Sequence, residues 1–179
     1  MRKQQTIGYT TLLVAVLLGL LGTVGFSVEG ELTGLQTPTV PERTFFADEP
    51  LPEHTLPLFV TATLNLNWDR EDIYVVIVDE DEKKTCESQP PGIFNEGTTT
   101  ACTPYDADVV AGATDGKKGL VWEVSEGIHF AGIGTFAEDG LPDGTALNLT
   151  YQVRFQAGFV TYFIIAIIGV AGFAYSRVE

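Results

Sequence analysis

The sequence has few of the side chains on which enzyme chemistry most often depends. It contains two histidines, His54 and His129, and four serines, none of which lies in a G-x-S-x-G pattern. The segment Gly132-Ile133-Gly134 lacks the third glycine and the following helix of a dinucleotide-binding loop. Carboxylate pairs suited to glycoside hydrolysis occur in any acidic chain, and nothing here selects one pair. We therefore expect a protein that is not an enzyme and holds no cofactor.

Aspartate, glutamate, lysine, arginine and histidine are absent from two long stretches, Ile7 to Phe26 and Ala157 to Tyr175. A helix needs about 20 apolar residues to cross the hydrocarbon core of a bilayer, and both stretches approach that length. The sequence therefore predicts two transmembrane helices with one domain between them. The predicted segments are a cytoplasmic N-terminus (1–6), a first transmembrane helix (7–26), an external proline-rich linker (27–57), an external domain (58–156), a second transmembrane helix (157–175) and a cytoplasmic C-terminus (176–179).

The basic residues beside these stretches predict the orientation. Arg2 and Lys3 precede the first stretch and Arg177 follows the second, and short basic flanks remain on the cytoplasmic side. Arg154 lies just before the second stretch, on the side predicted to be external, and so opposes this orientation. A single charge does not prevent the translocation of a long domain. We expect a multi-pass protein of the cell membrane with both termini cytoplasmic and the central domain extracellular.

A cleaved signal peptide is the alternative interpretation of the N-terminus. Arg2 and Lys3 would form its basic region and Leu12 to Leu21 its apolar region, although no A-x-A cleavage pattern follows. Both interpretations place the central domain outside the cell and leave the second helix as an anchor.

Basic residues are also scarce between the two stretches. Of the 24 acidic residues only Glu179 lies outside residues 27–156, and of the 10 basic residues three do, which leaves 23 against 7 and a net charge of −16. Such a domain is repelled by nucleic acid, so we expect no nucleic-acid partner. An acidic surface of this kind suits a salty exterior and is typical of halophilic proteins.

The chain has only two cysteines, Cys86 and Cys102, and both lie in the predicted external domain. An even number of cysteines in an oxidising compartment predicts one disulfide bond. Closing a loop of this length stabilises a fold by on the order of 3 kcal/mol in the chain-entropy model. Free thiols or metal ligands are the alternative, which the absence of a C-x-x-C pair disfavours.

The segment from Val28 to Pro57 has the composition of a linker. It contains five of the nine prolines, and this density disfavours both helix interiors and central strands. We expect extended chain that lies over the domain or forms a stalk.

The segment that follows has the pattern of short β-strands. Val60–Trp68 and Thr145–Phe155 alternate apolar and polar side chains, whereas Ile73–Val78 is apolar on both faces, as in a central strand. Shorter runs lie at residues 108–111, 120–124 and 128–136. The pattern predicts an antiparallel β-sandwich, immunoglobulin-like in outline. The apolar residues expected in its core are Leu64, Leu66, Trp68, Val75, Ile77, Leu149, Tyr151 and Val153.

Two short motifs are candidate sites on this domain. The acidic run Asp79, Glu80, Asp81 and Glu82 offers oxygen ligands for Ca²⁺, but it lacks the glycine and ligand spacing of an EF-hand, and a solvated hairpin turn is the favoured interpretation. The tripeptide that begins at Asn148 is an N-glycosylation sequon on the polar face of its strand.

The two histidines offer a weaker candidate site. His54 and His129, with a cysteine, would provide the ligands of a copper or zinc site. These residues are far apart in sequence, however, and no two of them have the short spacing of paired metal ligands. A packed or edge histidine is the favoured interpretation of His129.

Small residues recur every third position in both predicted helices. They are Gly19, Gly22 and Gly25 in the first helix and Ala166, Gly169 and Gly172 in the second. Small residues let helices approach closely, although glycine is in any case common in membrane helices. Because the two sets lie toward opposite leaflets, they do not meet in a simple hairpin, and we expect one or both to face another subunit.

These observations predict a non-catalytic two-pass membrane protein that displays an acidic β-sandwich outside the cell. It would be an accessory or structural subunit of a membrane or envelope assembly, with the lipid bilayer and other membrane subunits or further copies of itself as partners. The alternatives are an extracellular ligand-binding or receptor module and a subunit of a channel or transporter. A transport path usually has acidic, basic or histidine side chains within the membrane, and neither stretch contains one.

Overall fold

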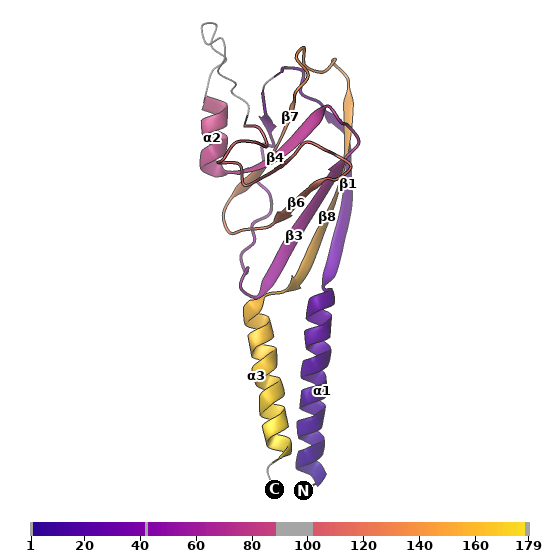
Figure 1. Cartoon of the computed structure of the whole chain (residues 1–179), viewed down its shortest axis with the longest axis vertical. Coiled ribbons are helices and arrows are strands. Elements are labelled where there is room, and N and C mark those ends of the chain that lie inside the picture. Colours follow the sequence, from indigo (N-terminus) through magenta and orange to yellow (C-terminus); the bar gives the residue numbers. More distant parts are fainter. Residues whose placement is uncertain (1, 42, 89–101, 178–179) are drawn as a thin grey trace. The chain divides into compact units, whose positions relative to one another are not determined.

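The structure is a computed structural model that describes residues 2–41, 43–88 and 102–177. Two long apolar helices, α1 (Arg2–Val24) and α3 (Phe159–Ser176), lie at the two ends of the described chain (Figure 1). A short helix, α2 (Glu80–Ser88), and the strands lie between them in sequence. The strands are β1 (Phe26–Gln36), β2 (Phe45–Phe46), β3 (Val60–Trp68), β4 (Ile73–Asp79), β5 (Ala111–Ala113), β6 (Leu120–Glu123), β7 (His129–Thr135) and β8 (Ala146–Ala157).

The chain divides into two compact units. The first unit contains α1, α3 and the chain segments next to them, and the second contains most of the strands together with α2. In residues, the first unit is Met1–Val28, Thr55–Thr63 and Arg154–Glu179, and the second is Glu29–His54 and Leu64–Val153.

The strands form two four-stranded sheets, with the orders β1-β8-β3-β6 and β2-β7-β4-β5. In the second sheet β4 pairs antiparallel with β7 from Ile73 opposite Thr135 to Asp79 opposite His129, and with β5 on its other side. The prediction of a mainly antiparallel β domain between two long apolar helices is therefore confirmed.

The hydrophobic core contains side chains from both sheets. Its buried members are Leu64, Leu66, Trp68, Ile73, Val75, Ile77, Leu120, Trp122, Leu141, Leu147 and Leu149. Six of the eight predicted core residues belong to it, and Tyr151 and Val153 pack against it while partly exposed. The indole N–H of Trp68 donates to the carbonyl oxygen of Ile73 at 3.0 Å, so the only polar atom of this buried side chain is hydrogen-bonded.

The alternating runs predicted the strands well, whereas the predicted linker contains two strands that its composition did not indicate. Strand β3 has the predicted bounds, and β4 is buried on both faces from Ile73 to Val78, as a central strand requires. The run at 108–111 becomes a strand only at Ala111. The segment 27–57 contains most of β1 and all of β2, which belong to different sheets. Strands can form in this segment because its prolines lie outside both of them.

The acidic run before Cys86 is a helix, so the prediction of a hairpin turn is wrong. The Asp79 carboxylate accepts the backbone N–H of Glu82 at 2.8 Å, which is an N-terminal cap. Glu80 and Lys84 form an ion pair at 2.9 Å one turn apart. Carboxylates in the first turn of α2 also complement the helix dipole.

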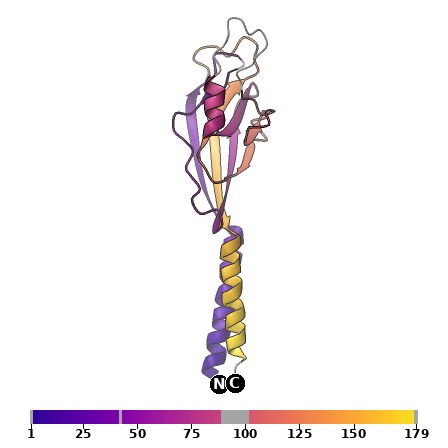
Figure 2. The same cartoon turned by 90° about the vertical axis from the view of Figure 1, so that its left-hand side faces the viewer.

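In the first unit, α1 and α3 lie side by side along their length in both views (Figures 1 and 2). Helix α1 ends before Gly25, whose φ of 66° is a left-handed conformation that favours glycine. Gly25 donates its N–H to the carbonyl oxygen of Leu21 at 2.9 Å and leads directly into β1. The start of α1 and the end of α3 lie at the same end of this pair (Figure 1).

Candidate functional site

Helices α1 and α3 meet through small side chains. A carbon atom placed on Gly8 would lie 2.6 Å from Cβ of Ser176, and one placed on Gly172 would lie 2.9 Å from Cβ of Thr11. One placed on Gly169 would lie 3.4 Å from Cβ of Ala15. Small residues on both helices therefore allow the close approach of their backbones.

This contact changes the interpretation of the repeated small residues. Gly169 and Gly172 face α1 of the same chain, and Gly22 lies against Ala157 and Tyr162, so these three glycines have contacts within the chain. A carbon atom on Gly19 would have nothing within 4 Å, and Ala166 is exposed. Gly25 ends α1 instead of belonging to a helix face.

The carbonyl end of α1 is bonded to the last residues of β8 within the first unit. Arg154 Nη2 donates to the carbonyl oxygen of Val24 at 3.1 Å, and Gln156 Nε2 donates to that of Thr23. These bonds satisfy acceptors that a helix end leaves unpaired, and the cation complements the negative end of the helix dipole. The ring of Phe26 stacks on that of Phe155, with centroids 5.0 Å apart.

Cys86 and Cys102 form a disulfide bond, as predicted, with their Cα atoms 5.9 Å apart. The bond joins α2 to the chain that precedes β5. A Glu82 oxygen lies 3.4 and 3.5 Å from the two sulfur atoms, and burial, followed by the carboxylates of Asp108 and Asp79, raises the pKa of Glu82.

The four calcium candidates are not brought together into one site. Asp79 caps α2, Glu80 and Asp81 pair with Lys84, and Glu82 turns toward the disulfide. Among the described residues, the one group of three potential metal ligands is Glu82 with Cys86 and Cys102. Both of those cysteines are already bonded to each other, so they offer no thiolate to a metal.

The candidate glycosylation residue Asn148 is exposed on β8 and participates in a hydrogen-bond network. Its Nδ2 donates to Asp69 Oδ2 at 2.7 Å, and its backbone N–H donates to Asp69 Oδ1 at 3.1 Å. Its Oδ1 accepts the N–H of Gly34, which has a φ of 71° within β1. The sequon therefore also connects three segments of the second unit.

The candidate metal ligand His129 is a packed histidine in the structure. It is 5% exposed and lies edge-on to Trp122, with ring centroids 4.9 Å apart. Its ring nitrogens lie 3.2 Å from Ser125 Oγ and 3.1 Å from the carbonyl oxygen of Gly127. Both nitrogens are thus within hydrogen-bonding distance of the protein itself, and His54 is in no group of potential ligands among the described residues.

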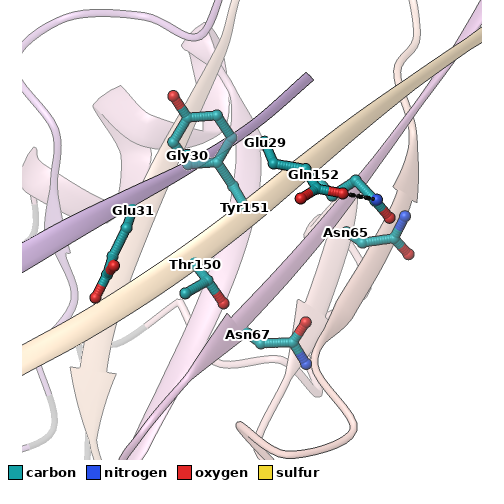
Figure 3. A pocket seen from close by; sticks show the side chains of 8 residues that line it. All are labelled: Glu29, Gly30, Glu31, Asn65, Asn67, Thr150, Tyr151 and Gln152. Atoms are coloured by element: carbon teal, nitrogen blue, oxygen red, sulfur yellow. Dashed lines mark hydrogen bonds between the residues drawn. The ribbon is translucent and has the colours of Figure 1, made fainter. Parts of the chain in front are cut away.

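A polar groove of about 430 Å³ lies over β1, β8 and β3, three neighbouring strands of one sheet (Figure 3). Its lining residues are Glu29, Gly30, Glu31, Asn65, Asn67, Thr150, Tyr151 and Gln152. Gln152 Nε2 donates to Glu29 Oε1 at 2.5 Å, and the Tyr151 hydroxyl lies where a side chain on Gly30 would otherwise be. The missing side chain of Gly30 therefore makes room for Tyr151.

The sequence predicted the polar face of β3 and β8 but not this groove. Its third wall is β1, which composition assigned to a linker. The wall residues offer carboxylate, amide and hydroxyl groups, which exchange hydrogen bonds with a polar ligand. No residue that lines the groove is a lysine, arginine, histidine, serine or cysteine. The only charged side chains of the lining are the carboxylates of Glu29 and Glu31, and the other polar groups are amides and hydroxyls.

No protein-family model and no curated protein matches the sequence. Several solved structures show a distant likeness to this chain, among them the following two. One is of Bacillus endospore appendages, described as a novel family of disulfide-linked pili, with a TM-score of 0.31, 9% identity and coverage of 74% of this chain and 89% of that chain. The other is of the SPBc2 prophage-derived protein YomS, with a TM-score of 0.28, 10% identity and coverage of 72% and 94%. Similarity at this level carries no argument about function.

Proposed function

We propose that this chain is a non-catalytic two-pass membrane protein whose terminal helices form a transmembrane hairpin. The observation that carries the proposal is the exposure of apolar side chains on both helices. In the most apolar stretches of α1 and α3, only 11% and 17% of the residues are buried. A helix in the core of a soluble protein is mostly buried, whereas exposed apolar surface of this extent favours a lipid environment.

The pairing of α1 with α3 favours retention of α1 over its removal as a signal peptide. Gly8, Thr11 and Ala15 contact α3 on the side where Gly172 and Gly169 lie. Arg154 and Gln156 bond the carbonyl end of α1. Cleavage would remove all these contacts and expose the small-residue face of α3, so in this proposal α1 is a permanent half of the hairpin.

The second unit is then an acidic β-sandwich displayed outside the cell. The two sheets share one hydrophobic core, which supports face-to-face packing. The disulfide supports an oxidising compartment. The basic residues at both ends of the chain support cytoplasmic termini.

Within the membrane, the protein acts as an accessory or structural subunit of a membrane or envelope assembly. The contact between α1 and α3 covers only one face of each helix, so exposed apolar faces remain available to lipid and to neighbouring subunits. A ligand-binding module is the second candidate, and the specific observation in its favour is the polar groove between Glu29, Asn65 and Thr150.

A labelling experiment in intact cells tests the topology. We would compare Gln5→Cys on α1 with Val121→Cys on β6, both at exposed positions, using a membrane-impermeant thiol reagent. The proposal expects labelling of Val121→Cys in intact cells and of Gln5→Cys only after permeabilisation. Labelling of both in intact cells contradicts the two-pass topology. Subunits that co-purify in mild detergent support assembly, whereas a lone monomer with a bound small molecule supports the ligand-binding module.

A further inference from the structure

The turn that precedes β3 displays large apolar side chains. Leu56, Leu58 and Phe59 are 57%, 63% and 43% exposed, and all three belong to the first unit, with α1 and α3. Single exposed apolar residues are common, but three within four positions of one turn form a cluster.

This turn is hydrogen-bonded to the first turn of α3. The carbonyl oxygen of Phe59 accepts the N–H of Gly158 at 2.7 Å and the hydroxyl of Thr161 at 2.7 Å, and that of Leu58 accepts the N–H of Val160 at 3.0 Å. A side-chain carbon on Gly158 would lie 2.6 Å from the Leu58 oxygen, so the close approach depends on glycine. The turn therefore lies at the same level as the start of α3.

The backbone carbonyl groups of Leu56, Leu58 and Phe59 are hydrogen-bonded within the protein. The carbonyl oxygen of Leu56 accepts the N–H groups of both Phe59 and Val60 at 3.0 Å, and Pro57 has no N–H to satisfy. The Leu58 and Phe59 carbonyl oxygens are bonded to α3. Backbone that enters the apolar part of a bilayer must have its polar groups paired, and these bonds meet that requirement for three carbonyl groups of the turn.

We propose that the turn Leu56–Phe59 inserts its side chains into the outer leaflet beside α3 and acts as an interfacial anchor. This inference rests on the proposed membrane insertion of α3. The bilayer is the occupant because the apolar surface of the turn is attached by hydrogen bonds to a helix that continues with exposed Phe159 and Phe163, whose rings stack 6.4 Å apart. Lipid that surrounds the start of α3 therefore also meets Leu58 and Phe59.

The anchor restrains the chain at two points on the same side of the bilayer. Helix α3 enters the membrane at Phe159, and the turn holds the chain that leads into β3 at the same level. A single helix end leaves the adjoining chain free to rotate about the helix axis, whereas a second lipid contact limits that rotation.

Spin labelling in phosphatidylcholine vesicles tests this inference on the full chain with its native disulfide intact. Single labels would be placed at Leu58→Cys, at Val170→Cys within α3 and at Val121→Cys on β6. Val121 is the matched control for Leu58, because the exposures of the two side chains are 64% and 63%. Collision with oxygen, which concentrates in lipid, and with a water-soluble nickel chelate would be measured at each position.

We expect the ratio of oxygen collisions to nickel-chelate collisions to be several-fold higher for the label at position 58 than for the label at 121. We also expect it to be lower at position 58 than at 170. A ratio at 58 equal to that at 121, with a lipid-like ratio at 170, overturns the anchor and leaves the membrane hairpin intact. A water-like ratio at 170 overturns the proposed function and the anchor with it. A label at 58 that is shielded from both reagents is covered by protein, such as a second copy, and also overturns the anchor.

Discussion

The carboxylate of Asp69 binds Asn148 through both of its oxygens. Oδ1 accepts the backbone N–H at 3.1 Å and Oδ2 accepts the side-chain amide at 2.7 Å, while the backbone N–H of Asp69 donates to the Asn148 carbonyl oxygen. The amide oxygen of Asn148 then accepts the N–H of Gly34. One aspartate after β3 thus fixes a residue of β8, which in turn bonds β1.

We predict that Asp69→Ala destabilises the second unit by about 1–2 kcal/mol at pH 7, because it removes two exposed hydrogen bonds, each with a usual net value of about 1 kcal/mol or less. The bond from the Asn148 backbone is the largest cause that lowers the pKa of Asp69. A lowered pKa means that the stabilisation is present above the unfolded pKa of about 4 and is lost as the pH falls through the folded value. Thermal unfolding at pH 7 and pH 3 measures this, with the exposed Asp139→Ala as the control. An equal loss at both pH values would contradict the ionic contribution.

We predict that Glu82→Gln stabilises the second unit at pH 7. Burial is the largest cause that raises the pKa of Glu82, so its ionised form is disfavoured in the folded protein. For such a group, stability rises as the pH falls, and the advantage of glutamine should disappear below the unfolded pKa of about 4.3. The melting temperature of each variant from pH 3 to 8 measures this, with Glu123→Gln, at an exposed position of β6, as the control. A variant less stable than wild type at pH 7 would refute the prediction.

The helix pairing predicts a cross-link that forms within one chain. The Cβ–Cβ distance for cysteines at Ala15 and Gly169 is 3.4 Å, close to the range of about 3.5–4.5 Å found in disulfides. Ala15→Cys/Gly169→Cys should therefore form a second intramolecular disulfide, detected by intact mass before and after reduction.

The matched control for this cross-link is Gly19→Cys/Gly169→Cys, because a carbon on Gly19 has no atom within 4 Å. This pair should remain reduced within the monomer. Covalent dimers from the first pair, without an intramolecular bond, would show that α3 meets α1 of another copy and would contradict the hairpin.

We predict that a substitution of Leu147, which is fully buried in β8, greatly lowers the stability of the second unit. Leu147→Ala should cost about 2–5 kcal/mol, because it removes apolar contacts and leaves a cavity. Val121→Ala, on the exposed face of β6, should change stability by less than about 0.5 kcal/mol. Thermal unfolding followed by the fluorescence of the buried Trp68 and Trp122 distinguishes the two. Equal melting temperatures would show that Leu147 is not part of the core.

Several features followed from the sequence because they depend on local pattern. In β3 and β8, alternation every second residue reports which side chains meet water, and the structure buries Leu147 and Leu149 while it exposes Asn148 and Thr150. The apolar run of β4 was long enough for one strand and buried on both faces. The disulfide followed from the number of cysteines. Helix α2 could also have been predicted from the sequence, because Asp79 is a local capping signal and the spacing of Glu80 and Lys84 is that of an ion pair along a helix.

Only the tertiary structure decided the role of β1 and the contacts of the glycines. The side chains of β1 are mostly exposed and show little of the apolar–polar alternation of a strand, and Gly34 interrupts the segment. The strand conformation of β1 therefore depends on its pairing with β8, which is distant in sequence. Depth along the helices correctly separated the two sets of small residues, but it did not indicate that Gly8, Thr11 and Ala15 lie opposite Gly169 and Gly172. Periodicity determines which face of an element is apolar, whereas the partner of that face is decided when distant segments pack together.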